Sequence, residues 1–224
     1  MKKLIFAVMI CVVFLSFMPV LAEESRVEPG MSAVLKRGAY YYVGSDIPEG
    51  SYIFNCVDNE NTDWVDACYV VLSTYDYLRL SEDLGKAMEF PELENGYGPI
   101  HAFLKAGTVV KVQYSDVTIT AVEPVTSGKL DKYSYYGIGY DIPEGAYYLT
   151  CDYEEDSEWH STCGVIISGY DLFYDDEMSQ LIYLDTYEED DTYSPKRIYL
   201  PAGMVLETIG TPIQITPAEP LAFE

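Results

Sequence analysis

The sequence has few positively charged residues for its length. Its 224 residues include 13 Lys and Arg against 37 Asp and Glu, which gives a formal net charge of −24 at pH 7. A protein that binds nucleic acid needs a basic surface to displace the counterions around phosphate groups, and docking on anionic lipid has the same requirement. The charge balance therefore predicts neither a nucleic-acid partner nor binding to an anionic membrane surface.

Histidine is also scarce, and familiar catalytic motifs are missing. The only two histidines are His101 and His160, and their counterparts in the internal repeat described below are Arg197 and Val65. The sequence has no Gly-rich phosphate loop, no HExxH zinc motif and no GxSxG nucleophile motif. We therefore predict no catalytic residue, no cofactor and no metal site. An enzyme that uses paired carboxylates on carbohydrate is the alternative.

Long hydrophobic stretches are missing after residue 22. Residues 1–22 have the layout of a secretory signal peptide, with Lys2 and Lys3, an apolar stretch over 4–17, and Ala22 before the expected cleavage site. An uncleaved membrane anchor is the alternative, since the apolar stretch is about long enough to span a bilayer. Cleavage changes the net charge to −26. The sequence predicts a secreted or extracytoplasmic protein, which can also be associated with the cell surface.

The sequence contains an internal duplication. Residues 40–56 read YYYVGSDIPEGSYIFNC and residues 135–151 read YYGIGYDIPEGAYYLTC, with ten of seventeen positions identical at an offset of 95. The match continues to the end of each copy, and the offset becomes 96 after one extra residue in the central loop of the second copy, so that Pro99 matches Pro195. We predict two tandem domains of one fold over 32–122 and 129–218, joined by a linker over 123–128, and each is large enough for its own core.

Short runs of Val, Ile, Tyr, Phe and Thr between turn residues predict β-strands. In the first copy these runs lie at 40–43, 51–55, 69–73, 100–104, 108–114 and 117–122, with a further strand or short helix within 78–90. No long segment has the periodicity of a helix. Many short strands separated by turns are typical of antiparallel sandwiches. The predicted fold class is all-β, with two tandem homologous antiparallel β-sandwich or jelly-roll-like domains.

A turn occurs once in each copy at the repeated Asp-Ile-Pro-Glu-Gly. Proline fixes φ near −65°, which suits the second position of a tight turn, and glycine is expected to take φ values that other residues avoid. The aspartate at the start of the motif can accept backbone N–H groups ahead of the turn. The predicted turn residues are Asp46, Pro48 and Gly50 in the first copy and Asp141, Pro143 and Gly145 in the second.

These residues carry a resemblance. The pattern G-x-D-I-P-E-G-x-Y, followed later by L-x-A-G, resembles the DIPAGEY-type repeat of exported proteins in Gram-positive bacteria. The resemblance implies a small all-β extracytoplasmic module whose activity is unsettled, and it supplies no catalytic residue. The present sequence departs from that pattern in having Glu49 and Glu144 where alanine is common, and in its paired cysteines.

Four cysteines follow the predicted signal peptide, twelve residues apart within each copy. Four cysteines allow three pairings. The duplication favours one bond in each copy, Cys56 with Cys68 and Cys151 with Cys163, because the two copies should fold alike. Free thiols are the alternative. The spacing does not match that of zinc ligands.

The loops between these cysteines are acidic, and each contains one tryptophan. The acidic clusters over 58–66 and 152–158 can supply oxygen ligands to Ca²⁺, but a solvated loop is the simpler interpretation. Trp64 and Trp159 can form exposed platforms for a sugar or a protein, or fold back over the disulfide. Tyr41 and Tyr136 are the other candidate ligand contacts, because consecutive tyrosines on a strand must point to both of its faces.

The function that we predict is that of a secreted, non-enzymatic, two-domain binding or cell-envelope-associated accessory protein. The expected partner is an envelope glycan or a surface protein. Two linked copies can bind a repetitive partner more tightly through effective concentration. A structural spacer without a small ligand is the second hypothesis, and the carboxylate-dependent enzyme is the third.

Overall fold

The computed structural model describes residues 28–57, 68–74, 85–90, 92–93, 96–125, 127–152, 163–170, 180–184 and 195–219. All the named elements in these ranges are β-strands, β1 to β18, which confirms the predicted all-β fold class. The predicted signal peptide lies outside the described residues. Of the segment 78–90, the part that is described contains the strand β5.

The first copy forms a sandwich of two four-stranded layers, accompanied by the small hairpin of β6 (Glu92–Leu93) and β7 (Gly96–Tyr97). One layer has the order β1-β10-β3-β8 and consists of β1 (Ser32–Leu35), β3 (Gly50–Cys56), β8 (Ile100–Leu104) and β10 (Val117–Ala121). The other has the order β2-β9-β4-β5 and consists of β2 (Tyr40–Tyr42), β4 (Tyr69–Thr74), β5 (Lys86–Glu89) and β9 (Thr108–Gln113).

The second copy repeats the two four-stranded layers strand for strand. One layer has the order β11-β18-β13-β16 and consists of β11 (Gly128–Leu130), β13 (Gly145–Cys151), β16 (Lys196–Leu200) and β18 (Ile213–Pro217). The other has the order β12-β17-β14-β15 and consists of β12 (Tyr135–Gly137), β14 (Cys163–Gly169), β15 (Gln180–Tyr183) and β17 (Met204–Gly210). The sequence duplication is therefore also a duplication of topology.

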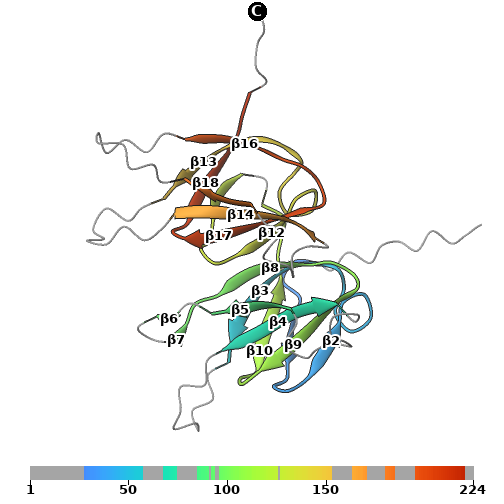
Figure 1. Cartoon of the computed structure of the whole chain (residues 1–224). Coiled ribbons are helices and arrows are strands. Elements are labelled where there is room, and N and C mark those ends of the chain that lie inside the picture. Colours follow the sequence, from blue (N-terminus) through green and yellow to red (C-terminus); the bar gives the residue numbers. More distant parts are fainter. Residues whose placement is uncertain are drawn as a thin grey trace, which may run out of the picture.

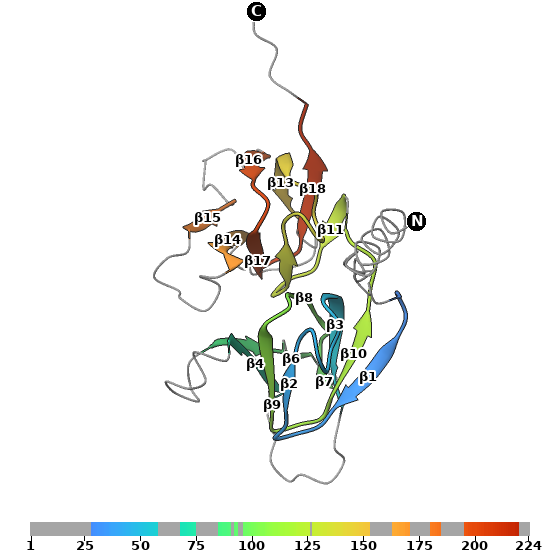
Figure 2. The ribbon, with the colours of Figure 1, turned by 90° about the vertical axis from the view of Figure 1, so that its right-hand side faces the viewer.

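The two copies are joined by one continuous sheet. Strand β8 of the first copy pairs in parallel with β12 of the second, through Ala102 and Tyr135, and the result is an eight-stranded sheet. Figures 1 and 2 show β8 at the boundary between the copies. We call this boundary the seam. The sequence predicts a separate core in each copy, whereas in the structure the core of the first copy also includes Tyr135, Tyr170 and Val205 of the second.

The seam changes the burial of the strand that forms it. All five residues of β8 (IHAFL) are buried, because its own core covers one face and the second copy covers the other. The equivalent strand β16 (KRIYL) has exposed and less exposed residues in alternation up to a buried last residue. Strand β10 shows the alternation expected of a sheet with one buried face. Burial on both faces of β8 is thus a product of the seam.

The repeated turn differs in one respect from the prediction. At this turn, the glycines with positive φ are Gly44 (99°) and Gly139 (93°), which precede the motif. The expectation that Gly50 and Gly145 take unusual φ values is wrong, because these two glycines begin the extended strands β3 and β13. The turn is closed by a tyrosine of the following strand: the hydroxyl of Tyr147 donates to the Pro143 carbonyl oxygen at 2.8 Å, and the first copy has the same bond.

The seam requires a glycine at position 137. A Cβ atom there would lie 2.7 Å from Cδ1 of Phe103, which is closer than such atoms can approach. We expect Gly137→Ala to lower the free energy of unfolding by about 1–3 kcal/mol, the usual cost of overpacking. Denaturant unfolding measures the change. Gly145→Ala is the matched control, since its Cβ would meet Tyr147 at an ordinary 3.5 Å. Equal losses in the two variants would contradict the steric account.

Candidate functional site

Three buried polar side chains meet at the seam. Ser51 lies on β3, His101 lies on β8, and Asp141 lies in the turn that follows β12. All three are nearly inaccessible to solvent. We call Ser51, His101 and Asp141 the seam cluster. Because buried polar groups are costly unless they are paired, their contacts indicate what the cluster does.

Asp141 is the centre of the seam cluster. Its Oδ1 accepts a hydrogen bond from the Ser51 hydroxyl, and its Oδ2 accepts one from the backbone N–H of Gly137 at 2.8 Å. The Nε2 atom of His101 lies 3.6 Å from Asp141 Oδ1. The other ring nitrogen of His101, Nδ1, lies 3.3 Å from the Tyr135 carbonyl oxygen. Side chains from both copies therefore converge on one carboxyl group.

Burial shifts the pKa values of both ionisable members of the cluster. It lowers the pKa of His101, and the nearby Asp141 carboxylate only partly offsets this effect. It raises the pKa of Asp141 against the opposing influence of His101, Ser51 and the Gly137 N–H group. The Ser51 hydroxyl donates to the Asp141 carboxyl group, and all three side chains of the cluster are nearly inaccessible to solvent. The geometry is that of a contact between the copies.

Aromatic rings and a further hydrogen-bonded tyrosine complete the seam. The ring of His101 stacks on Tyr136 with centroids 4.3 Å apart, and Phe103 stacks on Tyr140 at 4.4 Å. The hydroxyl oxygen of Tyr170 accepts the backbone N–H of Lys105 at 2.7 Å, and burial raises the pKa of Tyr170 to about 12. These contacts add buried area and fix the orientation of one copy on the other.

A salt bridge also crosses the seam. The Nζ atom of Lys86 on β5 lies 3.0 Å from Oε2 of Glu207 on β17, and both side chains are largely shielded from solvent. Truncating one partner of such a pair leaves the other charge poorly solvated. The contact therefore favours the observed register of the two copies.

The outer face of the second copy exposes Arg197 and Tyr199, the counterparts of two β8 residues that the seam buries in the first. Tyr148 on β13 is directly opposite Arg197 on β16, and Tyr199 lies two residues further along β16. Tyr199 is 58% exposed and Tyr148 is 39% exposed, and Arg197 is exposed as well. We call Tyr148, Arg197 and Tyr199 the tyrosine face. The repeat offsets make Ile53, His101 and Phe103 its counterparts in the first copy.

One ring of the tyrosine face is held in place. The hydroxyl of Tyr199 donates to Oε1 of Glu144 at 2.7 Å. This hydrogen bond to the carboxylate raises the pKa of Tyr199. A large exposed ring that is already oriented loses little conformational entropy when a partner covers it. The tyrosine face thus combines a fixed aromatic surface with a guanidinium and a carboxylate.

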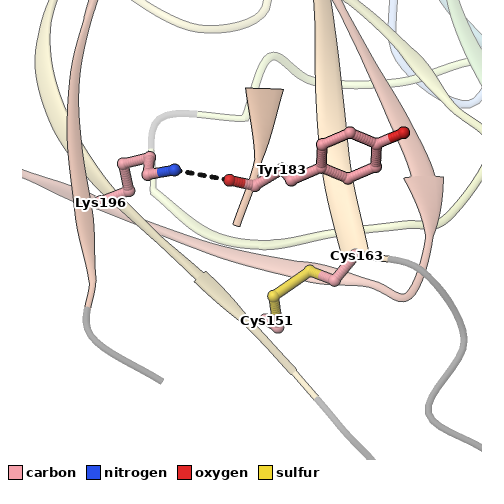
Figure 3. The surroundings of a disulfide bond; sticks show 4 residues. All are labelled: Cys151, Cys163, Tyr183 and Lys196. Carbon is pink, nitrogen blue, oxygen red and sulfur yellow. Dashed lines mark hydrogen bonds between the residues drawn. A yellow bond between two sulfur atoms is a disulfide. The ribbon is translucent and has the colours of Figure 1, made fainter. Parts of the chain in front are cut away.

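The disulfides lie elsewhere, between the two layers of each sandwich. Cys151 ends β13 and Cys163 begins β14, with Cα atoms 6.1 Å apart (Figure 3). Cys56 and Cys68 make the equivalent bond in the first copy, with Cα atoms 5.9 Å apart. The predicted pairing within each copy is confirmed. Each bond links the two layers of its sandwich, and Cys68 directly precedes β4.

A second link between layers lies beside the disulfide of the second copy. The Nζ atom of Lys196 on β16 donates to the carbonyl oxygen of Tyr183 on β15 at 2.6 Å (Figure 3). The strands belong to different sheets. The two layers of the second sandwich are therefore joined by a side-chain contact as well as by the disulfide.

The other predicted ligand contacts are placed differently. Trp64 and Trp159 lie outside the described residues, as does most of both acidic loops. Tyr41 is half-buried, and its hydroxyl oxygen accepts the Lys36 N–H. Tyr136 is 1% exposed, so the prediction that it contacts a ligand from solvent is wrong. Its ring is covered because the seam buries both faces of its strand.

Sequence reasoning missed the tyrosine face. The available signal was the difference between IHAFL and KRIYL at equivalent positions. The first segment is apolar apart from one histidine, and the second begins with two basic residues and alternates polar or aromatic with aliphatic side chains from Arg197 on.

Within the described ranges, no group of three or more His, Cys, Asp and Glu side chains is arranged to hold a metal ion. The same part of the chain contains no helix with the length and apolar character needed to cross a membrane. Comparison of the chain with protein-family models, curated proteins and solved structures finds no match.

The burial of His101 predicts a pH dependence of stability. Because burial lowers its pKa below the usual 6.5, the unfolded chain takes up this proton more readily than the folded chain. The contribution of His101 is present above pH 6.5 and is lost as the pH falls from there through the lowered pKa. Asp141, with a raised pKa, acts in the opposite direction above pH 3.8.

We therefore expect the stability advantage of the native chain over His101→Gln to shrink between pH 7.5 and 5.5. Denaturant unfolding at several pH values measures this difference. The variant His160→Gln, which removes the other histidine, is the control. A difference that stays constant for His101→Gln across this range would contradict the assigned burial effect.

Each disulfide should stabilise its own sandwich. Replacing Cys151 and Cys163 together by alanine removes a link across a twelve-residue separation, which is worth about 3 kcal/mol in the chain-entropy treatment. We expect the free energy of unfolding to fall by about that amount. A reducing agent should lower the stability of the native chain further than that of the double variant. If reduction leaves the native chain as stable as before, the assignment fails.

Proposed function

We propose that this chain is a secreted, non-enzymatic binding protein of the cell envelope whose ligand contacts the tyrosine face. The observation that carries the proposal is the exposure, in the second copy, of the positions that the first copy uses to bind another protein surface. Two disulfides in the described part of the chain support an oxidising, extracytoplasmic setting. The partner that we propose is an envelope glycan or a surface protein.

The chemistry of the tyrosine face fits such a partner. Tyrosine and arginine are enriched among residues that dominate binding energy, because they offer large contact area with polar ends. Tyr148 and Tyr199 are diagonal neighbours across paired strands, a spacing of about 7–8 Å. Glu144 and Arg197 add an acceptor and several donors for hydroxyl, amide or carboxylate groups.

The seam supports a fixed geometry in place of flexible avidity. The two copies share a sheet, a salt bridge and the seam cluster, so the second copy is held in one orientation on the first. We propose that the first copy acts as a rigid support that sets the direction of the tyrosine face. A spacer without a ligand is the second function that this rigid arrangement supports.

Binding to isolated cell-envelope material tests the proposal. We expect saturable co-sedimentation of the full mature chain, and a loss of affinity of at least about fivefold for Tyr148→Ala and for Tyr199→Ala, the size of a contact worth 1 kcal/mol or more. Tyr114→Asn is the matched control, since Tyr114 is 53% exposed but lies in the first copy, and asparagine tolerates its positive φ.

The outcomes separate the candidates. Equal affinity for native chain and face variants would move the binding site away from the tyrosine face. No saturable binding by the native chain would favour the spacer. Thermal unfolding of each variant confirms that the exposed substitutions leave the fold intact.

A further inference from the structure

The seam is an interface between unlike surfaces. The first copy contributes the edge strand β8, and the second contributes β12 with its turn. An interface of this head-to-tail type leaves one unused counterpart of each surface at the ends of the arrangement. By the repeat, these are β16 of the second copy and β2 of the first. Each is a terminal strand of its sheet, and within the described residues no further strand pairs with it.

The β16 edge carries side chains similar in chemistry to those by which β8 contacts the second copy. Arg197 stands where His101 lies, Ile198 replaces Ala102, and Tyr199 replaces Phe103. Arginine is planar and can stack on an aromatic ring as the imidazole of His101 does, and its charge persists without burial. Its several N–H groups can hold a carboxylate through two bonds. A second bond from arginine could take the place of the hydrogen bond that Ser51 donates to Asp141, since Ala146 stands at the position of Ser51.

The β2 edge lacks the residues by which β12 and its turn contact the first copy. Tyr42 stands in place of Gly137, the position at which a Cβ atom would lie 2.7 Å from Phe103. Ser45 stands in place of Tyr140, whose ring stacks on Phe103. Ala39 replaces Ser134, whose hydroxyl accepts the His101 N–H at 3.3 Å. A second copy of this chain therefore cannot present the surface that β16 is shaped to receive.

We infer that β16 is a receiving edge for a partner protein that carries the features of β12, and that the chain does not polymerise. Resting on the proposed function, this inference names the partner of the tyrosine face. The partner presents an edge strand with a glycine facing Tyr199, followed by a turn whose carboxylate faces Arg197. The strand adds to the sheet through its backbone, as extended peptides add to exposed sheet edges.

The test uses a variant of this chain as the probe. Tyr42→Gly/Ser45→Tyr rebuilds a β12-like surface on β2, where Asp46 already accepts the Tyr42 N–H at 2.8 Å in the same way as Asp141 accepts that of Gly137. Arg197→Glu in the same chain disables its own receiving edge, so it can donate but not receive. We call this triple variant the donor chain.

Sedimentation velocity of mixtures gives the answer. We expect the native chain and the donor chain each to remain monomeric alone, and to form a 1:1 complex when mixed, with a Kd below about 1 mM. In the matched control, the single variant Arg197→Glu replaces the native chain in the mixture. It should lose at least tenfold in affinity for the donor chain, since two carboxylates then face each other.

Two results would overturn the inference. One is the absence of a complex between the native and donor chains in this concentration range, with both folded by circular dichroism. The other is self-association of the native chain that Arg197→Glu abolishes, because the native β2 edge would then bind β16. Either result leaves the proposed function standing if envelope binding still depends on Tyr148 and Tyr199, so the two failures are distinguishable.

Discussion

The pairing of β8 with β12 is the constraint on which the rest of the structure depends. A single pair of Cα partners, Ala102 and Tyr135, joins two four-stranded layers into one sheet. So short a parallel pairing gives little hydrogen-bond energy and specifies its register weakly. Side chains must supply both, and the seam cluster, the stacked rings and the Lys86–Glu207 salt bridge do so.

The seam cluster illustrates how a costly contact can specify a structure. Burying Asp141 and His101 removes both from water, and the raised and lowered pKa values record that cost. A buried charged pair adds little net stability, but removing one member leaves the other buried without a partner, which is strongly unfavourable. Another orientation of the copies would deprive the Asp141 carboxyl of its hydrogen bond from the Ser51 hydroxyl. The cluster therefore acts as a selector of one geometry.

The same pairing makes two copies of one fold unequal. In the first copy the outer face at β8 is buried in the seam. In the second copy the equivalent face is exposed and carries Tyr148, Arg197 and Tyr199. The two copies differ in sequence at positions whose side chains form the seam. Gly137 corresponds to Tyr42, and His101 corresponds to Arg197. Divergence between the copies is thus a record of which edges are paired.

The sequence by itself determined the strands, the duplication and the disulfide pairing, because each depends on local patterns or on the requirement that equal sequences fold alike. It also placed Asp46 and Asp141 in equivalent turns, where both accept a backbone N–H group. Tertiary structure alone decided that Tyr136 is buried while Tyr41 is half-buried, and that β8 is covered on both faces while β16 is not. These differences come from contacts between residues far apart in the chain, and a one-pair parallel bridge leaves no periodic signal in the sequence.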